Sequence, residues 1–337
     1  MVGSLLVNVG IILAATVAIW KGSDWLEASS ERLAAYYGLP DVVQGAIIVA
    51  VGSSFPELAT VVVAAIGGSM PLGVGAIVGS AIFNVLVIPA VAGIATDDDI
   101  NSNRTLVYKE AQFYMLAMSV LLITFALAVI YYPGEASLSG TVTRPLAAIP
   151  LALYGLYIFI QYQDTADYES DAAPDGIDAR RQWLFLAAGL LVILVAVEQL
   201  VHSVGAIGRT FGVDEFLLGV TILAAATSLP DTLVSVRAAR DGRGVTSLAN
   251  VLGSNTFDLL VAIPVGVLIV GVWTVDFAMA VPMFGVLTGA TILLFTALRT
   301  DLALSTLESY TLLGAYVLFV AWVVAETASL IGGILPN

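Results

Sequence analysis

Long and almost uninterrupted apolar stretches recur along this 337-residue chain and limit the folds open to it. Most run for roughly 18 to 25 residues, the length of helix that crosses the hydrocarbon core of a bilayer. Hydrophobic residues make up 59% of the chain and charged residues 11%, which is more apolar surface than a soluble core can bury. Because backbone polar groups in lipid need internal partners, the stretches are predicted to be helices rather than the short alternating strands of a β-barrel. We therefore predict an all-α integral membrane protein.

Apolar runs and the breakers between them predict ten transmembrane helices. Two of them, the first and the sixth, are longer than a perpendicular span, so we expect them to tilt or to extend into the interface. The expected ranges are 4–36, 41–66, 71–95, 104–130, 145–162, 182–209, 214–240, 245–270, 277–298 and 306–332.

The longest polar connector, residues 163–181, divides the ten predicted helices into two sets of five. It is acidic and contains Pro174 and Gly176, which are typical of a hinge between structural units. We predict one five-helix unit over residues 1–162, a cytoplasmic linker over 163–181 and a second five-helix unit over 182–337.

The two halves are sequence repeats, because a shift of 174 residues aligns their most distinctive positions without a gap. Gly38 falls on Gly212, Ser54 on Ser228, Pro56 on Pro230, Gly79-Ser80 on Gly253-Ser254 and Phe83 on Phe257. Each half holds an odd number of predicted helices, so the copies must enter the membrane in opposite orientations. Inverted repeats of this kind are typical of alternating-access transporters.

The distribution of charge predicts how the chain lies in the membrane and which partners it excludes. With both termini outside the cell, the outer loops keep two basic residues, Arg144 and Arg209, and the inner side collects nine, as the positive-inside rule requires. The nine are Arg32, Arg104, Lys109, Arg180, Arg181, Arg237, Arg240, Arg243 and Arg299. The formal net charge of −14 lies mostly in loops and leaves no basic stripe for nucleic acid. We expect the cell membrane as the location.

The most polar segments of the repeat fall inside predicted helices, where an ionised side chain costs at least about 2.5 to 3.5 kcal/mol. Proline at 56 and 230 removes a backbone donor and should break the second and seventh helices near midspan. Ser54 to Glu57 and Ser228 to Asp231 also have the spacing of a capping box. Each acid is therefore expected at the positive end of a restarted half-helix.

Pairs of polar residues four positions apart should share one face of a helix. Across the pseudo-twofold axis, these faces are predicted to converge on one cavity lined by oxygen, with two or three carboxylates and no cysteine in the chain. Such a site suits hard cations such as Ca²⁺ and Na⁺ rather than zinc, copper or iron. The candidate residues are Ser53, Ser54, Glu57, Ser80, Asn84, Thr227, Ser228, Asp231, Ser254 and Asp258.

Four segments in register, GSSFPEL, GAIVGSAIFN, ATSLPDTLVS and ANVLGSNTFD, resemble the two alpha-repeat motifs of the cation/calcium exchanger superfamily, here over 41–90 and 215–264. The resemblance implies a ten-helix sodium/calcium exchanger with an ion-binding core from the second, third, seventh and eighth helices. The first and sixth helices would slide across this core. Glu57 and Asp231 would be the central ligands for which Ca²⁺ and Na⁺ compete, and the other eight candidates would complete the sites.

Two departures from the common pattern keep related functions open. Ser53 replaces a commoner threonine, and Asp231 stands where many members have glutamate. Asp231 together with Asp258 resembles the potassium-dependent branch, so K⁺-dependent Na⁺/Ca²⁺ exchange is one alternative. Proton-coupled divalent cation antiport is another, although the GN-x-x-E motif common in that branch is absent.

The remaining expectations concern other protein classes. An intramembrane aspartyl protease would place its acids in a GxGD context, which Asp231 and Asp258 lack, so we expect no enzyme activity and no cofactor. A passive cation channel is a further alternative. Asp24 and Glu198, also related by the 174-residue shift, are expected either to attract cations from buried positions or to reach an interface.

Overall fold

The computed structural model of the protein describes residues 2–38, 50–96, 98–136, 138–164 and 176–327. Eight of its helical segments are long and apolar enough to cross a membrane. These are α1 (Val2–Tyr36), α4 (Met70–Ile94), η2 with α5 (Thr105–Glu110, Ala111–Tyr131), α6 (Arg144–Asp164), α7 (Ala179–Phe211), α11 with η4 and α12 (Gly244–Phe257, Asp258–Ala262, Ile263–Val270), α13 (Phe277–Arg299) and α14 (Thr306–Thr327).

Two further segments are broken helices. The first consists of α2 (Ala50–Ser53) and α3 (Phe55–Ile66). The second consists of α8 (Glu215–Leu218), η3 (Gly219–Leu223), α9 (Ala224–Thr227) and α10 (Leu229–Arg240), and it bends by 45° before α10. The predicted helices therefore recur within a few residues, but residues 41–49 and 328–332 lie outside the described ranges. The count of ten spans stays a prediction.

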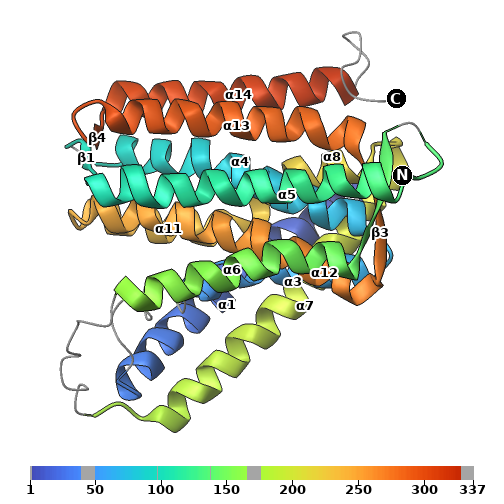
Figure 1. The fold of residues 1–337 in the computed structure, drawn as a ribbon. Helices are drawn as coiled ribbons and strands as arrows, with labels where there is room; N and C mark the ends of the chain where they lie inside the picture. Colours follow the sequence, from blue (N-terminus) through green and yellow to red (C-terminus); the bar gives the residue numbers. More distant parts are fainter. Residues whose placement is uncertain (1, 39–49, 97, 137, 165–175, 328–337) are drawn as a thin grey trace.

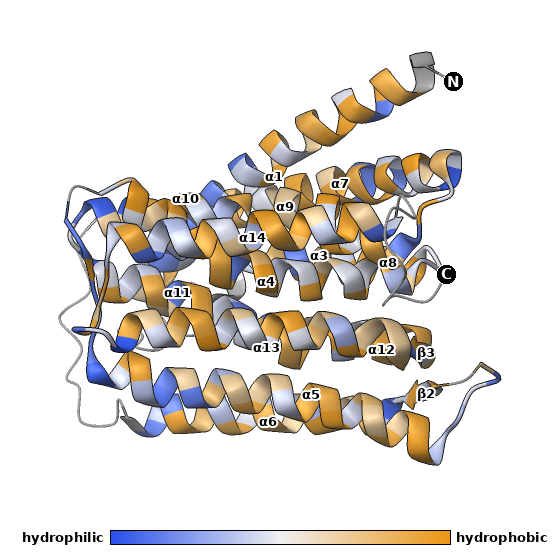
Figure 2. Cartoon of the chain, turned by 90° about the horizontal axis from the view of Figure 1, so that it is seen from above, coloured by the Kyte–Doolittle hydropathy of each residue, from blue (hydrophilic) through white to orange (hydrophobic). Residues whose placement is uncertain are grey.

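Helix α4 forms the centre of the bundle, and α1 and α7 lie at its edge (Figure 1). In the most apolar stretch of α4, 83% of the residues are buried, against 17% in α1. Hydrophobic residues cover most of the length of α5, α12 and α13, and hydrophilic residues gather where α10 ends and α11 begins (Figure 2). Apolar residues are thus mostly buried in α4 and mostly accessible in α1.

The long helices α1 and α7 run side by side and obliquely to the other helices (Figure 1). At 1.5 Å per residue each is about 50 Å long, more than a bilayer core requires, which agrees with the predicted tilt. They cross where Gly22 faces Gly189, because a Cβ built on Gly22 would lie 3.1 Å from the Gly189 carbonyl oxygen. The two backbones meet there with no side chain between them.

Helix ends in the two halves are made by corresponding residues. Gly38 after α1 and Gly212 after α7 have φ values of 63° and 69°, a left-handed conformation that glycine adopts readily. The side chain of Asp214 accepts hydrogen bonds from the backbone N–H groups of Phe216 and Leu217 and so begins α8. The alignment of Gly38 with Gly212 therefore has a structural basis at the two turns.

Two short antiparallel ribbons, which the sequence analysis did not anticipate, connect the loops. Strand β1 (Ile100–Asn101) pairs with β4 (Ala303–Leu304), and β2 (Ser139–Thr143) pairs with β3 (Val272–Asp276). Alternating β-branched residues in SGTVT and VWTVD were the available signal. Each ribbon joins a loop of the first half to a loop of the second.

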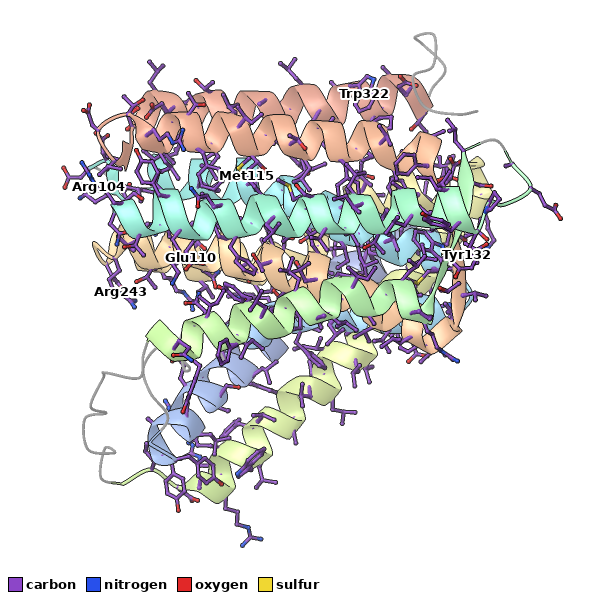
Figure 3. The ribbon with its side chains drawn as sticks, viewed as in Figure 1. Arg104, Glu110, Met115, Tyr132, Arg243 and Trp322 are labelled. Carbon is purple, nitrogen blue, oxygen red and sulfur yellow. The ribbon has the colours of Figure 1, made fainter. Side chains whose placement is uncertain are left out.

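The two ends of the bundle differ in charge. Arg104 and Arg243 project at one end, and Tyr132 and Trp322 lie toward the other (Figure 3). Helix α1 begins and α14 finishes toward the end that holds Tyr132 and Trp322 (Figure 1). The basic side chains thus gather at the end opposite these two helix termini.

Helix α4 crosses the second broken segment at glycines. A Cβ on Gly75 would collide with the backbone of Phe216, and one on Gly219 would collide with the carbonyl oxygen of Leu72. Because the obstructing atoms are backbone, they cannot move aside as a flexible side chain would. This crossing fixes the distance between α4 and the break in the second half.

We expect Gly75→Ala to destabilise the protein by about 1 to 3 kcal/mol, since the added methyl group overpacks a backbone crossing. Thermal unfolding of the purified protein in detergent would measure the loss as a lower melting temperature. Gly285→Ala is the matched control, because a Cβ there meets nothing within 4 Å. Equal melting temperatures for the two variants would contradict the prediction.

Candidate functional site

Each of the two broken helices is interrupted at a serine that lies three residues before an acidic residue. Ser54 separates α2 from α3, and Ser228 separates α9 from α10. Pro56 and Pro230 occupy the first turn of the restarted helices and lack the N–H group that would continue the ladder. Glu57 and Asp231 lie in those first turns, as predicted, where the helix dipole favours negative charge.

The predicted capping box is wrong in its hydrogen bonds. Neither the Ser54 nor the Ser228 side chain caps the helix that follows it. The Ser228 hydroxyl instead pairs with the Ser80 hydroxyl on α4 at 2.5 Å, and Ser54 faces Asp258. Both side chains therefore turn away from their own helix and toward the other half of the chain.

Glu57 and Asp231 have equivalent hydroxyl surroundings. Ser80 Oγ lies 3.5 Å from Glu57 Oε1, and Thr227 is the second hydroxyl beside this carboxylate. Ser53 and Ser254 occupy the corresponding places beside Asp231. The 174-residue shift converts one set into the other, so each central acid faces one hydroxyl from each half.

Hydroxyl pairs also hold the two halves together at this level. Ser53 Oγ lies 3.1 Å from Ser254 Oγ, which joins the first break to α11. The ten predicted site residues are all buried, with at most 1% of their surface exposed. The structure thus gathers on α2, α3, α4, α9, α10, α11 and η4 the residues that the sequence singled out.

Several of these buried oxygens have no hydrogen-bond donor among the described residues. They are Glu57 Oε2, both oxygens of Asp231, both oxygens of Asp258, Ser54 Oγ and Asn84 Oδ1. Burying a carboxylate without a partner is costly, so such groups normally bind a cation or a donor. An all-oxygen set of carboxylate, amide and hydroxyl groups fits hard cations.

The expected convergence of two or three carboxylates on one cavity stays a prediction. Within the residues that the structure describes, no three acidic or histidine side chains lie close enough to hold a single metal ion. Glu57 and Asp231 line neither of the cavities found. The hydroxyl pairs Ser80–Ser228 and Ser53–Ser254 occupy the centre instead.

Asn255 is a site component that the sequence analysis missed. Its side-chain Oδ1 accepts a hydrogen bond from Asn84 Nδ2 at 3.0 Å. Its Nδ2 donates to the Ala81 carbonyl oxygen and to the Tyr114 hydroxyl, both at 3.2 Å. Asn255 is a polar residue within the GSNTFD segment of a predicted membrane helix, which was the available signal. The network holds Asn84 in place.

A large cavity of about 1470 Å³ opens at the basic end of the bundle; we call it the vestibule. It lies between α1, η2, α6, α10 and α11, and it reaches inward to Asn250 and Gly253, next to Ser254. Glu110, labelled in Figure 3, lines it and accepts hydrogen bonds from Tyr157 and Gln161. The vestibule therefore connects one end of the molecule to the edge of the site.

Asp24 and Glu198 do not have equivalent environments. Asp24 lines the vestibule and forms ion pairs with Lys21 at 3.4 Å and with Arg237 at 3.5 Å. Glu198 is exposed on α7, which is inconsistent with the buried alternative and leaves the interfacial one. The physical reason is that α7 contacts the bundle through Val197 and Leu200, which turn Glu198 outward.

Comparisons with known proteins identify a family for the chain and a similar fold. The profile of the family described as sodium/calcium exchanger protein matches residues 7–163 and 181–325. An uncharacterized membrane protein of Methanocaldococcus jannaschii is 28% identical over 78% of this chain and 82% of its own length. A sodium/calcium exchanger of Methanosarcina acetivorans is 26% identical over 74% and 79%. The fold resembles a solved structure of the sodium-calcium exchanger NCX_Mj, with a TM-score of 0.64, 22% identity and coverage of 94% and 99%.

We expect Asn255→Ala to cost about 1 to 3 kcal/mol of stability, because it leaves the buried Asn84 amide and the Tyr114 hydroxyl without their partner. Tyr114→Phe is the matched control, since it removes one hydrogen bond of the same network and should cost about 1 kcal/mol. Thermal unfolding in detergent compares the two variants. A melting temperature for Asn255→Ala at or above that of Tyr114→Phe would refute the assignment.

Proposed function

The chain belongs to the sodium/calcium exchanger protein family, and we propose that it is an antiporter that exchanges Ca²⁺ for Na⁺ across the cell membrane. One observation carries the proposal: Glu57 and Asp231 lie buried at equivalent helix breaks with carboxylate oxygens that lack donors among the described residues. Cations are the cargo that such oxygens bind.

The two ions would compete for shared ligands. Ca²⁺ takes six to eight oxygen ligands, including carboxylates, carbonyls and hydroxyls. Glu57 and Asp231 are the proposed central ligands, and the carbonyl oxygens freed by Pro56 and Pro230 are available beside them. Asn84, Asp258 and the hydroxyl groups of 53, 54, 80, 227, 228 and 254 complete the proposed sites. Because one ligand set cannot hold both ions fully, release of one follows from binding of the other.

Transport by alternating access between two inverted five-helix repeats is the proposed mechanism. The vestibule supports this mechanism, since it connects the edge of the site with one end of the bundle. Helices α1 and α7 are the proposed moving parts, because they run obliquely at the edge and contact each other along their lengths (Figure 1). Their sliding would close the vestibule and open a path from the other end.

The proposed orientation places both termini outside the cell. Arg104 and Arg243 then lie at the cytoplasmic end, as the positive-inside rule requires (Figure 3). The vestibule would open to the cytoplasm in this conformation.

K⁺-dependent exchange is a second candidate. Asp258 is a buried third acid whose repeat counterpart is Asn84, so the ligand set is asymmetric. Human sodium/potassium/calcium exchanger 5 is 24% identical over 70% of this chain and 64% of its own length. Na⁺-driven Ca²⁺ flux measured with and without K⁺, and separately across a pH gradient, distinguishes this candidate and proton coupling from simple Na⁺/Ca²⁺ exchange.

We expect Glu57→Gln and Asp231→Asn each to abolish Na⁺-gradient-driven ⁴⁵Ca²⁺ uptake in vesicles while the protein stays folded. Each change keeps the side-chain shape and removes the negative charge that holds Ca²⁺. Asp301→Asn is the control: this exposed loop residue has a φ of 57°, which asparagine tolerates, so uptake should be unchanged. Normal uptake by both site variants would disprove the site assignment.

The proposed orientation predicts which loops a membrane-impermeant maleimide reaches on intact cells. The chain contains no cysteine, so single cysteines can be introduced without background. Glu135→Cys, in the exposed loop before β2, should be labelled, and Asp241→Cys, in the exposed loop after α10, should be labelled only after the cells are opened. The reverse pattern would show the opposite orientation.

A further inference from the structure

Glu27 is an acidic side chain of α1 that lies outside the repeat motifs and close to the site. It lines the vestibule, and a Cβ built on Gly52 would lie 3.8 Å from Glu27 Cγ. Gly52 immediately precedes Ser53, so this carboxylate lies against the first helix break. Glu27 therefore stands where the vestibule meets the ion-binding core.

One carboxylate oxygen of Glu27, Oε1, is buried and has no hydrogen-bond partner among the described residues. The nearby base, Arg237, pairs with Asp24 instead. A buried carboxylate that lacks a partner is unfavourable unless a cation or donor joins it.

The charged group that faces Glu27 from the core is Asp231. The two carboxylates are electrostatic neighbours, and Asp24 and Glu31 of α1 add to the negative charge. Asp231 is 1% exposed, and neither of its oxygens has a donor among the residues described. Two unpartnered carboxylates on opposing helices attract a divalent cation more strongly than a monovalent one, because the attraction scales with charge.

The residue of α7 that corresponds to Glu27 is apolar. The 174-residue shift places Glu27 on Val201 of α7, which is 7% exposed and packs in the apolar cluster with Leu200 and Val204. The shift also places Arg237 on Val63. A carboxylate next to the site thus belongs to one gating helix and not to its repeat partner.

We propose that Glu27 is an entry ligand, which takes a divalent cation from the vestibule and passes it to Asp231, so that the two faces of the protein differ in their apparent affinity for Ca²⁺. This inference rests on the proposed exchange function. Glu27 would act only while α1 leaves the vestibule open, and it would add no ligand on the α7 side.

The first test compares the KM for Ca²⁺ at the two faces, in inside-out and right-side-out membrane vesicles. Glu27→Gln should raise the KM at the vestibule face about tenfold, since an acidic cleft concentrates cations, and should leave the other KM and the kcat within about twofold. Glu27→Asp should recover most of the affinity. Asp301→Asn is the control, because it removes one negative charge at an exposed loop residue outside the vestibule lining.

The second test measures cation binding independently of transport. Ala28→Cys places a single thiol in the vestibule next to Glu27. In purified protein, Ca²⁺ should slow maleimide labelling of this thiol, and Glu27→Gln should abolish the slowing while Asp301→Asn should not. A labelling rate that does not depend on Ca²⁺, or an equal change of the KM for Ca²⁺ at both faces in Glu27→Gln, overturns the entry-ligand proposal. Slowed labelling together with wild-type vesicles that show no Na⁺-driven flux would instead overturn the exchange function alone.

Discussion

The structure depends on three buried carboxylates, Glu57, Asp231 and Asp258, which lie deep in an apolar helix bundle without a basic partner in the described part of the chain. Hydrocarbon offers no solvent to stabilise such charges, so the local backbone must do so. Helix breaks at Ser54 and Ser228 bring positive helix ends to Glu57 and Asp231, and hydroxyl groups surround both acids. The carboxylate oxygens that remain without donors are the ones that the proposed cation would contact.

Much of this could be predicted from the sequence because the signals were local. The lengths of the apolar stretches predicted the helices, and Pro56 and Pro230 predicted the positions of the helix breaks within two residues. The 174-residue repeat identified ten candidate site residues, and the structure shows that all ten are buried. A shared spacing in two copies is a stronger constraint than any single motif, because the copies must satisfy the same geometry.

What the sequence could not supply were the contacts that depend on rotamers and on packing between helices. The spacing of Ser54 and Glu57 indicated a cap, but the hydroxyl faces Asp258 in another helix. Glu198 is exposed although its repeat partner Asp24 lines the vestibule, since the repeat does not fix which face of α7 packs. Glu27 and Asn255 belong to no spaced pair. Asn255 could have been noticed as a polar residue in a predicted membrane helix, but the contacts of both residues depend on the three-dimensional arrangement.

The crossing of Gly22 and Gly189 bears on how tightly the two ion fluxes are linked. Because the backbones of α1 and α7 touch there, neither helix can slip far along the other without a collision. We expect α1 and α7 to move together as one rigid body. Under the proposed alternating-access mechanism, opening one side would then close the other at the same time, and no intermediate would offer ions a continuous path down their gradients. Resistance to ion leakage would thus depend on the two glycines, Gly22 and Gly189, at which the helix backbones meet.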